Sequence, residues 1–162
     1  KGQYRIKDNF LAFWFRFVYP MRSFIESDHP EIAMAKLKTG FIPNHVGYVY
    51  EDICRQKMWE LNVQGKLPFL FDRVGRWWGG KDTEIDIVAI DTTDRSKIIF
   101  GECKFHQNMP MQLSELHQLK EKTAVVPWGN ANRDEYFALF CISGYSEDLQ
   151  QLAQEDSHLL LM

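Results

Sequence analysis

The sequence predicts an α/β domain in which helices flank a central mixed sheet on both faces. Two segments, 83–90 and 97–105, are apolar on both faces and flank a polar turn, as expected of a hairpin inside such a sheet. Helical and strand-like periodicities alternate after residue 45, and a content of 45% hydrophobic and 14% aromatic residues suffices for a substantial core. A disordered chain is therefore excluded.

The chain begins with a segment that we expect to be helical. After a short strand-like tail at residues 3–6, Asp8 or Asn9 can cap a helix that begins near Phe10. Apolar side chains from there to Val18 point in every direction of a helix, so we expect this helix to be buried on several sides.

A second, shorter helix is expected from Glu31 to Lys38, with Pro30 at its start and Gly40 at its end. We place the domain boundary directly after this region. Residues 1–44 are then a helical lead-in, and residues 45–162 form the α/β domain.

Within the α/β domain, the periodicity of the apolar residues predicts the elements in order. They are a helix from His45 to about Trp59, a strand from Leu67 to Trp78 with a turn or bulge at 73–75, strands 83–90 and 97–105, a helix 111–122, a strand 136–143, a helix capped by Ser146 that runs to about Gln154, and a last strand 159–162.

The central hairpin allows its register to be predicted. Its turn is centred near Asp94, so paired residue numbers sum to about 188 and Asp86 faces Glu102. Because side chains alternate, we expect one face to carry Glu84, Asp86, Val88 and Ile90 beside Ile98, Phe100, Glu102 and Lys104.

Two acids and a lysine thus lie at one end of one face. Placing Asp86 opposite Glu102 costs stability unless a cation compensates. Mg²⁺ or Mn²⁺ would fit, because Mg²⁺ prefers oxygen ligands, and the backbone carbonyl of Cys103 could supply a further oxygen. Lys104 could orient or help deprotonate a water on the metal for attack on a phosphodiester. The alternative is a semi-buried ion-pair cluster.

The segments Glu84–Ala89 and Gly101–Lys104, with an acid-bearing helix before them and a helix after them, resemble the PD-(D/E)XK nuclease superfamily. That superfamily includes Holliday-junction resolvases and restriction endonucleases. The resemblance implies a restriction-endonuclease-like αβββαβ core that cuts DNA with a divalent metal. It also implies Asp86 and Glu102 as metal ligands and Lys104 as the catalytic lysine.

A second resemblance covers nearly the whole chain, through the segments 4–17, 50–51, 75–78 and 101–105. Together they resemble the C-terminal domain of unknown function in archaeal and bacterial AAA-type ATPases. The resemblance implies that a P-loop ATPase domain and a winged helix precede this domain in the same chain, with residues 1–6 as the last strand of the winged helix. The absence of a P-loop agrees with an excised C-terminal piece.

Two helical residues are further candidates for the site. Glu51 would be a third acid near the metal, because the first helix of superfamily members often supplies a glutamate; the alternative is a solvated acid on the helix flank. Lys120 lies within the apolar stripe of Leu113 and Leu116, where members of the superfamily often present a polar residue to the site.

A basic and aromatic loop precedes the acidic strand. Arg73, Arg76, Trp77, Trp78 and Lys81 are suited to phosphate contacts and base stacking, so we expect weak DNA binding there. Equally, the tryptophans could cover the hairpin or meet the ATPase portion.

Composition narrows the classes of function. A net charge of −3 excludes a protein that coats nucleic acid through general basicity. Three cysteines without a CxxC pair predict neither a disulfide framework nor a cysteine zinc site, which favours the reducing cytoplasm. The longest apolar stretch is shorter than the roughly 20 residues that span a bilayer, so no membrane partner is expected.

Two functions therefore compete for this domain: a metal-dependent endonuclease, and a non-catalytic module that binds DNA or regulates the ATPase. The modest net charge favours the second slightly. Aromatic residues within the segment 10–25 also predict a homo-oligomer.

Overall fold

The computed structural model describes residues 5–79, 83–129 and 132–162, and only the backbone of residues 43 and 44. Residues 1–4 of the predicted strand at 1–6 and the predicted DNA contact Lys81 lie outside the described residues, and residues 5 and 6 form no strand. The chain divides into two compact units, Lys1–Val49 and Tyr50–Met162, and each is described by itself.

The first unit is helical. Its elements are α1 (Asn9–Phe13), a π-helical turn (Trp14–Val18), a 3-10 turn (Tyr19–Met21), α2 (Arg22–Glu26), α3 (Pro30–Phe41), a second π-helical turn (Ile42–Val46) and the start of α4 (Gly47–Val63). The predicted cap is confirmed, because the carboxylate of Asp8 accepts a 2.8 Å hydrogen bond from the N–H of Leu11. Pro30 opens α3 as predicted.

Two predictions for this unit are wrong. Gly40 does not end its helix, because its backbone is not in the left-handed conformation that such a C-cap requires. The helical segment from Asn9 to Val18 contains no buried residue, although Phe13 and Phe17 pack edge-on against the ring of Phe41.

The second unit contains the predicted α/β sheet. Its elements beyond α4 are β1 (Arg73–Gly79), β2 (Thr83–Ile90), β3 (Lys97–Lys104), α5 (Leu113–Thr123), β4 (Asp134–Cys141), α6 (Glu147–Glu155) and β5 (Leu159–Leu161). The five strands lie in sequence order, with β1, β2 and β3 antiparallel and β3, β4 and β5 parallel. The expected mixed sheet and the αβββαβ order are therefore confirmed.

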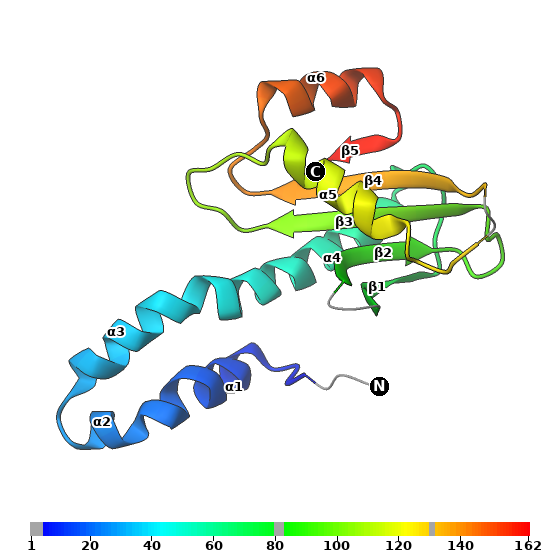
Figure 1. Ribbon diagram of the computed structural model, residues 1–162. Helices are drawn as coiled ribbons and strands as arrows, with labels where there is room; N and C mark the ends of the chain where they lie inside the picture. The colour runs from blue at the N-terminus through cyan, green and yellow to red at the C-terminus, as the bar shows by residue number, and fades with distance from the viewer. Residues whose placement is uncertain (1–4, 80–82, 130–131) are drawn as a thin grey trace. The chain divides into compact units, whose positions relative to one another are not determined.

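Helices cover both faces of this sheet (Figure 1). Leu116 and Leu119 of α5 and Leu149 of α6 pack in a core with Ile98. The next residue along β3, Ile99, belongs to a second core on the opposite face, with side chains from α4. No helix within the described part of the chain has the length and apolar character needed to cross a membrane.

The predicted first strand is too long. Residues 67–72 form no strand, and residues 73–75 belong to β1 rather than to a turn. The predicted alternative, a bulge, agrees with the register shift that begins at Gly75. The buried side chain of Asn62 in α4 explains the late start, because its amide binds both the N–H (3.0 Å) and the carbonyl (2.9 Å) of Phe71. These backbone groups are thereby withdrawn from any strand ladder.

The predicted register of the central hairpin is confirmed. The paired residues run from Ile87 opposite Gly101 to Ile90 opposite Ile98, and each pair sums to 188. The predicted alternation fails at the start of β2, because Ile85 packs in the same core as Ile98 and not with Ile87.

A local irregularity between β1 and β2 causes this change of face. Gly75 lies opposite Val88, whereas Trp77 lies opposite Ile85. Two residues of β2, one of them Asp86, therefore lie opposite the single residue Arg76, as in a β-bulge. Such bulges re-aim side chains, and this one occurs at a predicted metal ligand.

Candidate functional site

Asp86 is positioned by the irregularity in β2. One of its carboxylate oxygens, Oδ2, accepts a 2.9 Å hydrogen bond from the N–H of Cys103, just beyond the last paired residues of β2 and β3. Its own carbonyl accepts a 3.2 Å hydrogen bond from Arg55. These hydrogen bonds hold the side chain of Asp86 against β3 at Cys103, the residue before Lys104.

The electrostatic environment of Asp86 disfavours its charged form. Burial raises the pKa of this carboxyl to about 6, and the negative charge of Glu102 adds to the effect, while the N–H of Cys103 acts to lower it. Asp86 and Glu102 thus lie close enough to repel each other, as the hairpin register predicts.

Glu102 is buried, with 5% of its surface exposed, and both of its carboxylate oxygens are paired. Lys104 lies 2.7 Å from Oε1, and Lys122 of α5 lies 3.0 Å from Oε2. Two lysines at hydrogen-bonding distance compensate for the burial of one carboxylate.

Lys104 is a cation in this arrangement. Burial acts to lower the pKa of its ammonium group, but the charge of Glu102 and their hydrogen bond outweigh burial, so the pKa is raised. The protonated group can stabilise negative charge and orient a water molecule, whereas proton abstraction would first require its own deprotonation.

Glu51 belongs to a neighbouring ion-pair network. Its carboxylate binds the guanidinium of Arg76, which also lies 2.7 Å from Glu84, and Arg55 approaches it to 3.8 Å. Arg55 also pairs with Asp52. The helix α4 thus supplies the predicted third acid, but arginines surround it.

The other residues that we predicted to contact DNA or the site lie at separate places in the second unit. Arg76 lies within the acidic network, Trp77 packs in the core opposite Ile85, and Trp78 is exposed. Arg73 is exposed at the start of β1, opposite Ile90. The ammonium group of Lys120 lies 5.1 Å from the ring centre of Phe137 rather than at the acids.

Sequence reasoning missed Lys122. The buried stripe of α5 is formed by Leu116, Leu119 and Thr123, so the helix is rotated from the stripe we predicted through Leu113 and Lys120. A stripe through Leu119 would have revealed Lys122, because residues three apart lie side by side on a helix.

The described part of the chain contains no group of three or more His, Cys, Asp or Glu side chains arranged to hold a metal ion. Asp86 and Glu102 remain a pair of neighbouring carboxylates, and Mg²⁺ commonly takes only one or two carboxylates together with waters. The donor set therefore fits a hydrated divalent cation, provided that Glu102 shares an oxygen with it.

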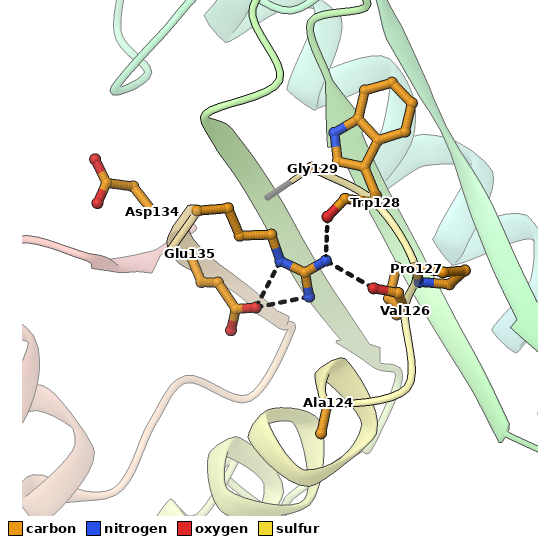
Figure 2. Close-up of a pocket in the computed structure, with 8 residues that line it drawn as sticks. Ala124, Val126, Pro127, Trp128, Gly129, Asp134 and Glu135 are labelled. Atoms are coloured by element: carbon orange, nitrogen blue, oxygen red, sulfur yellow. Dashed lines mark hydrogen bonds and ion pairs between the residues drawn. The ribbon is translucent and has the colours of Figure 1, made fainter. Parts of the chain in front are cut away.

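A hollow of about 600 Å³ lies at the opposite end of the β3–β4 pair, near the start of β4 (Figure 2). The guanidinium of Arg133, which lines this hollow, donates hydrogen bonds to the carbonyls of Val126 and Trp128 and pairs with the carboxylate of Glu135. Arg133 also binds the carbonyl of Thr123 at the end of α5. This arrangement holds the backbone of Val126 and Trp128 beside the start of β4.

Comparison with known proteins finds a family match and one relative. The family DUF234, described as archaeal and bacterial proteins of unknown function, matches residues 14–123. An uncharacterized protein of Methanocaldococcus jannaschii is 34% identical over 140 residues, which are 86% of this chain and 30% of that protein. The chain therefore spans about a third of the relative's length. No solved structure matches the chain.

Proposed function

The chain belongs to the DUF234 family of archaeal and bacterial proteins of unknown function. From its acidic cluster, formed by Asp86 and Glu102, we propose that it is a divalent-metal-dependent DNA endonuclease domain. The observation that carries the proposal is the proximity of the carboxylates of Asp86 and Glu102, just beyond the last paired residues of the central hairpin. Burial and mutual repulsion raise the pKa of Asp86 to about 6, a cost that a bound divalent cation would relieve.

The residues of the site would divide the work. Asp86 and Glu102 would hold Mg²⁺ or Mn²⁺, with the carbonyl of Cys103 as a further oxygen. When bound, the cation would supply charge stabilisation and water activation for hydrolysis of a phosphodiester. The ammonium group of Lys104, 2.7 Å from Glu102, would orient the attacking water and stabilise negative charge on the phosphate.

Two further features support this proposal. The order αβββαβ and the hairpin that carries Asp86, Glu102 and Lys104 agree with the resemblance to the PD-(D/E)XK superfamily. Glu51 extends from α4 toward the same end of β2, where Arg76 links it to Glu84. We also propose that ATPase and winged-helix domains accompany this domain in its full-length protein, as the second resemblance implies.

A second candidate function is a non-catalytic module that binds DNA or regulates the ATPase. The ion pairing of the cluster favours it, because Lys104 and Lys122 occupy both oxygens of Glu102, and Arg76 binds Glu51. In that case the cluster would be a self-compensated structural feature.

Metal binding separates the two functions. We would titrate Mn²⁺ into the wild-type chain, Asp86→Asn and the control Asp148→Asn by calorimetry, and then assay cleavage of supercoiled and branched DNA with the same samples. Asp86→Asn preserves the shape of the side chain and an oxygen that can accept the N–H of Cys103. Asp148 is an exposed acid in the first turn of α6 and lies outside the cluster.

We expect Mn²⁺ binding and Mg²⁺- or Mn²⁺-dependent cutting by the wild type and by Asp148→Asn. Asp86→Asn should lose at least about 100-fold in cleavage, because removal of one electrostatic contact in an active site commonly costs that much. A folded wild-type chain without Mn²⁺ binding would contradict the nuclease and favour the regulatory module.

A further inference from the structure

Within the described residues, Lys122 pairs with Glu102 but has no part in the proposed chemistry. It comes from near the end of α5, while Glu102 and Lys104 come from β3. Its ammonium group lies 3.0 Å from Oε2 of Glu102, and 31% of its side chain is exposed. Lys122 therefore forms an ion pair with a buried carboxylate while its own side chain is partly exposed to solvent.

The carboxylate of Glu102 has no oxygen without a cation. Oε1 binds Lys104 at 2.7 Å and Oε2 binds Lys122 at 3.0 Å. A divalent cation shared with Asp86 would approach an oxygen that already has an ammonium group beside it, so the two cations would repel each other. Lys104 is held more closely and is also attracted by the charges of Asp86 and Glu115, so Lys122 is the easier partner to displace.

We propose that Lys122 is an internal counter-ion of Glu102 that competes with the divalent metal for this carboxylate. The inference rests on the proposed metal site and goes beyond it. In the metal-free protein, Lys122 keeps a buried carboxylate paired and so positions it. Metal binding at this carboxylate would weaken the ion pair through repulsion between the two cations, and the affinity for metal would be reduced accordingly.

Removal of this lysine should therefore strengthen metal binding, opposite to the usual effect of damaging a site. We would measure Mn²⁺ affinity of the 162-residue chain by calorimetry for wild type, Lys122→Met, Lys122→Gln and Lys122→Arg. Lys122→Gln retains a hydrogen-bond donor for Glu102 and so guards against misfolding of the methionine variant. Circular dichroism would verify that each variant is folded.

The matched control is Lys57→Met. Lys57 also pairs with a glutamate, Glu60, at 3.1 Å, but both side chains are more than half exposed on the surface of α4. Its removal changes the net charge by the same amount without touching the candidate site. It therefore reports any general effect of charge on Mn²⁺ binding.

We expect Lys122→Met and Lys122→Gln to bind Mn²⁺ about fivefold or more tighter than the wild type, as loss of a partly buried ion pair would produce. Lys122→Arg and Lys57→Met should remain near the wild type. Binding by the two uncharged variants alone would also support the proposal. Equal or weaker binding by folded uncharged variants, with a wild type that binds, would overturn the competition and leave the metal site intact. Absence of binding in every folded protein would overturn both.

Discussion

Asp86 is a residue whose negative charge destabilises the fold. Its pKa of about 6, against an ordinary value of 3.8, means that the folded chain binds a proton more tightly than the unfolded chain does. Stability from this group is therefore complete below about pH 4 and is lost as the pH rises through about 6. Above that range the folded protein carries a poorly compensated carboxylate.

We predict that Asp86→Asn stabilises the chelator-treated protein at neutral pH. Near pH 4, the free energy of unfolding of the variant should be equal to or lower than that of wild type. By pH 7 the difference should have shifted in favour of the variant by on the order of 2 kcal/mol, because a pKa unit corresponds to about 1.4 kcal/mol. Urea unfolding in EDTA at several pH values would measure this difference.

Asp94 provides a control of opposite sign. Its pKa is lowered by hydrogen bonds from Ser96, so its stabilising contribution is present at neutral pH and is lost on acidification. The free energy of unfolding of Asp94→Asn should accordingly not increase relative to that of wild type as the pH rises. A difference between Asp86→Asn and wild type that does not change with pH would contradict the raised pKa of Asp86.

At the scale of elements, β3 requires close packing beside the site. Gly101 precedes Glu102, and a Cβ atom there would lie 2.9 Å from the carbonyl oxygen of Ala138 and 2.9 Å from the Cβ of Ile87. These neighbours belong to the strands on either side of β3, so neither can move away easily. Glycine thus allows three strands to approach at the residue before the candidate ligand.

We predict that Gly101→Ala destabilises the domain by about 1–3 kcal/mol, the usual cost of overpacking a core. Gly75→Ala is the matched control, because a Cβ at this strand position would have no heavy atom within 4 Å. It should be neutral or stabilise by about 0.5–1 kcal/mol through the unfolded chain. Equal urea midpoints for Gly101→Ala and wild type would contradict the close approach.

The central hairpin could be predicted because its turn and its alternation of side chains are local features. The same rules missed the change of face at Ile85, since it depends on how β1 pairs with β2. The strand at 67–72 was overpredicted because Asn62, on a different element, takes the backbone groups of Phe71. Lys122 was missed because one apolar stripe does not fix the rotation of a helix.

The candidate site divides along the same line. The hairpin register predicts that Asp86 lies near Glu102, and their mutual repulsion confirms it. Asp86 itself lies in the β1–β2 irregularity, just beyond the last paired residues of the hairpin. Lys104 lies two residues from Glu102 on β3 and was predicted with it. The other cations around the acids come from α4, β1 and α5, so they depend on packing that no local pattern encodes. Propensity and spacing therefore predicted the acids better than their partners.

At the scale of the whole molecule, the two units differ in how they bury apolar side chains. The second unit has two buried cores, whereas the helices from α1 to α3 in the first unit contain no buried residue. Phe10, Phe15 and Tyr19 expose 66%, 52% and 56% of their surface. Aromatic side chains gathered on an exposed segment are typical of a contact surface.

We predict that the chain self-associates through this aromatic segment. The double variant Phe10→Ser, Phe15→Ser should raise the dissociation constant at least about tenfold, because burial of one phenylalanine contributes about 1.5–3 kcal/mol. Light scattering coupled to size-exclusion chromatography over a range of concentrations would measure the mass. Val63→Ser, which changes an apolar residue that is 84% exposed in the second unit, should leave the mass unchanged. A wild-type chain that remains monomeric at every concentration would refute the association and show that a second copy of the chain does not cover the aromatic segment.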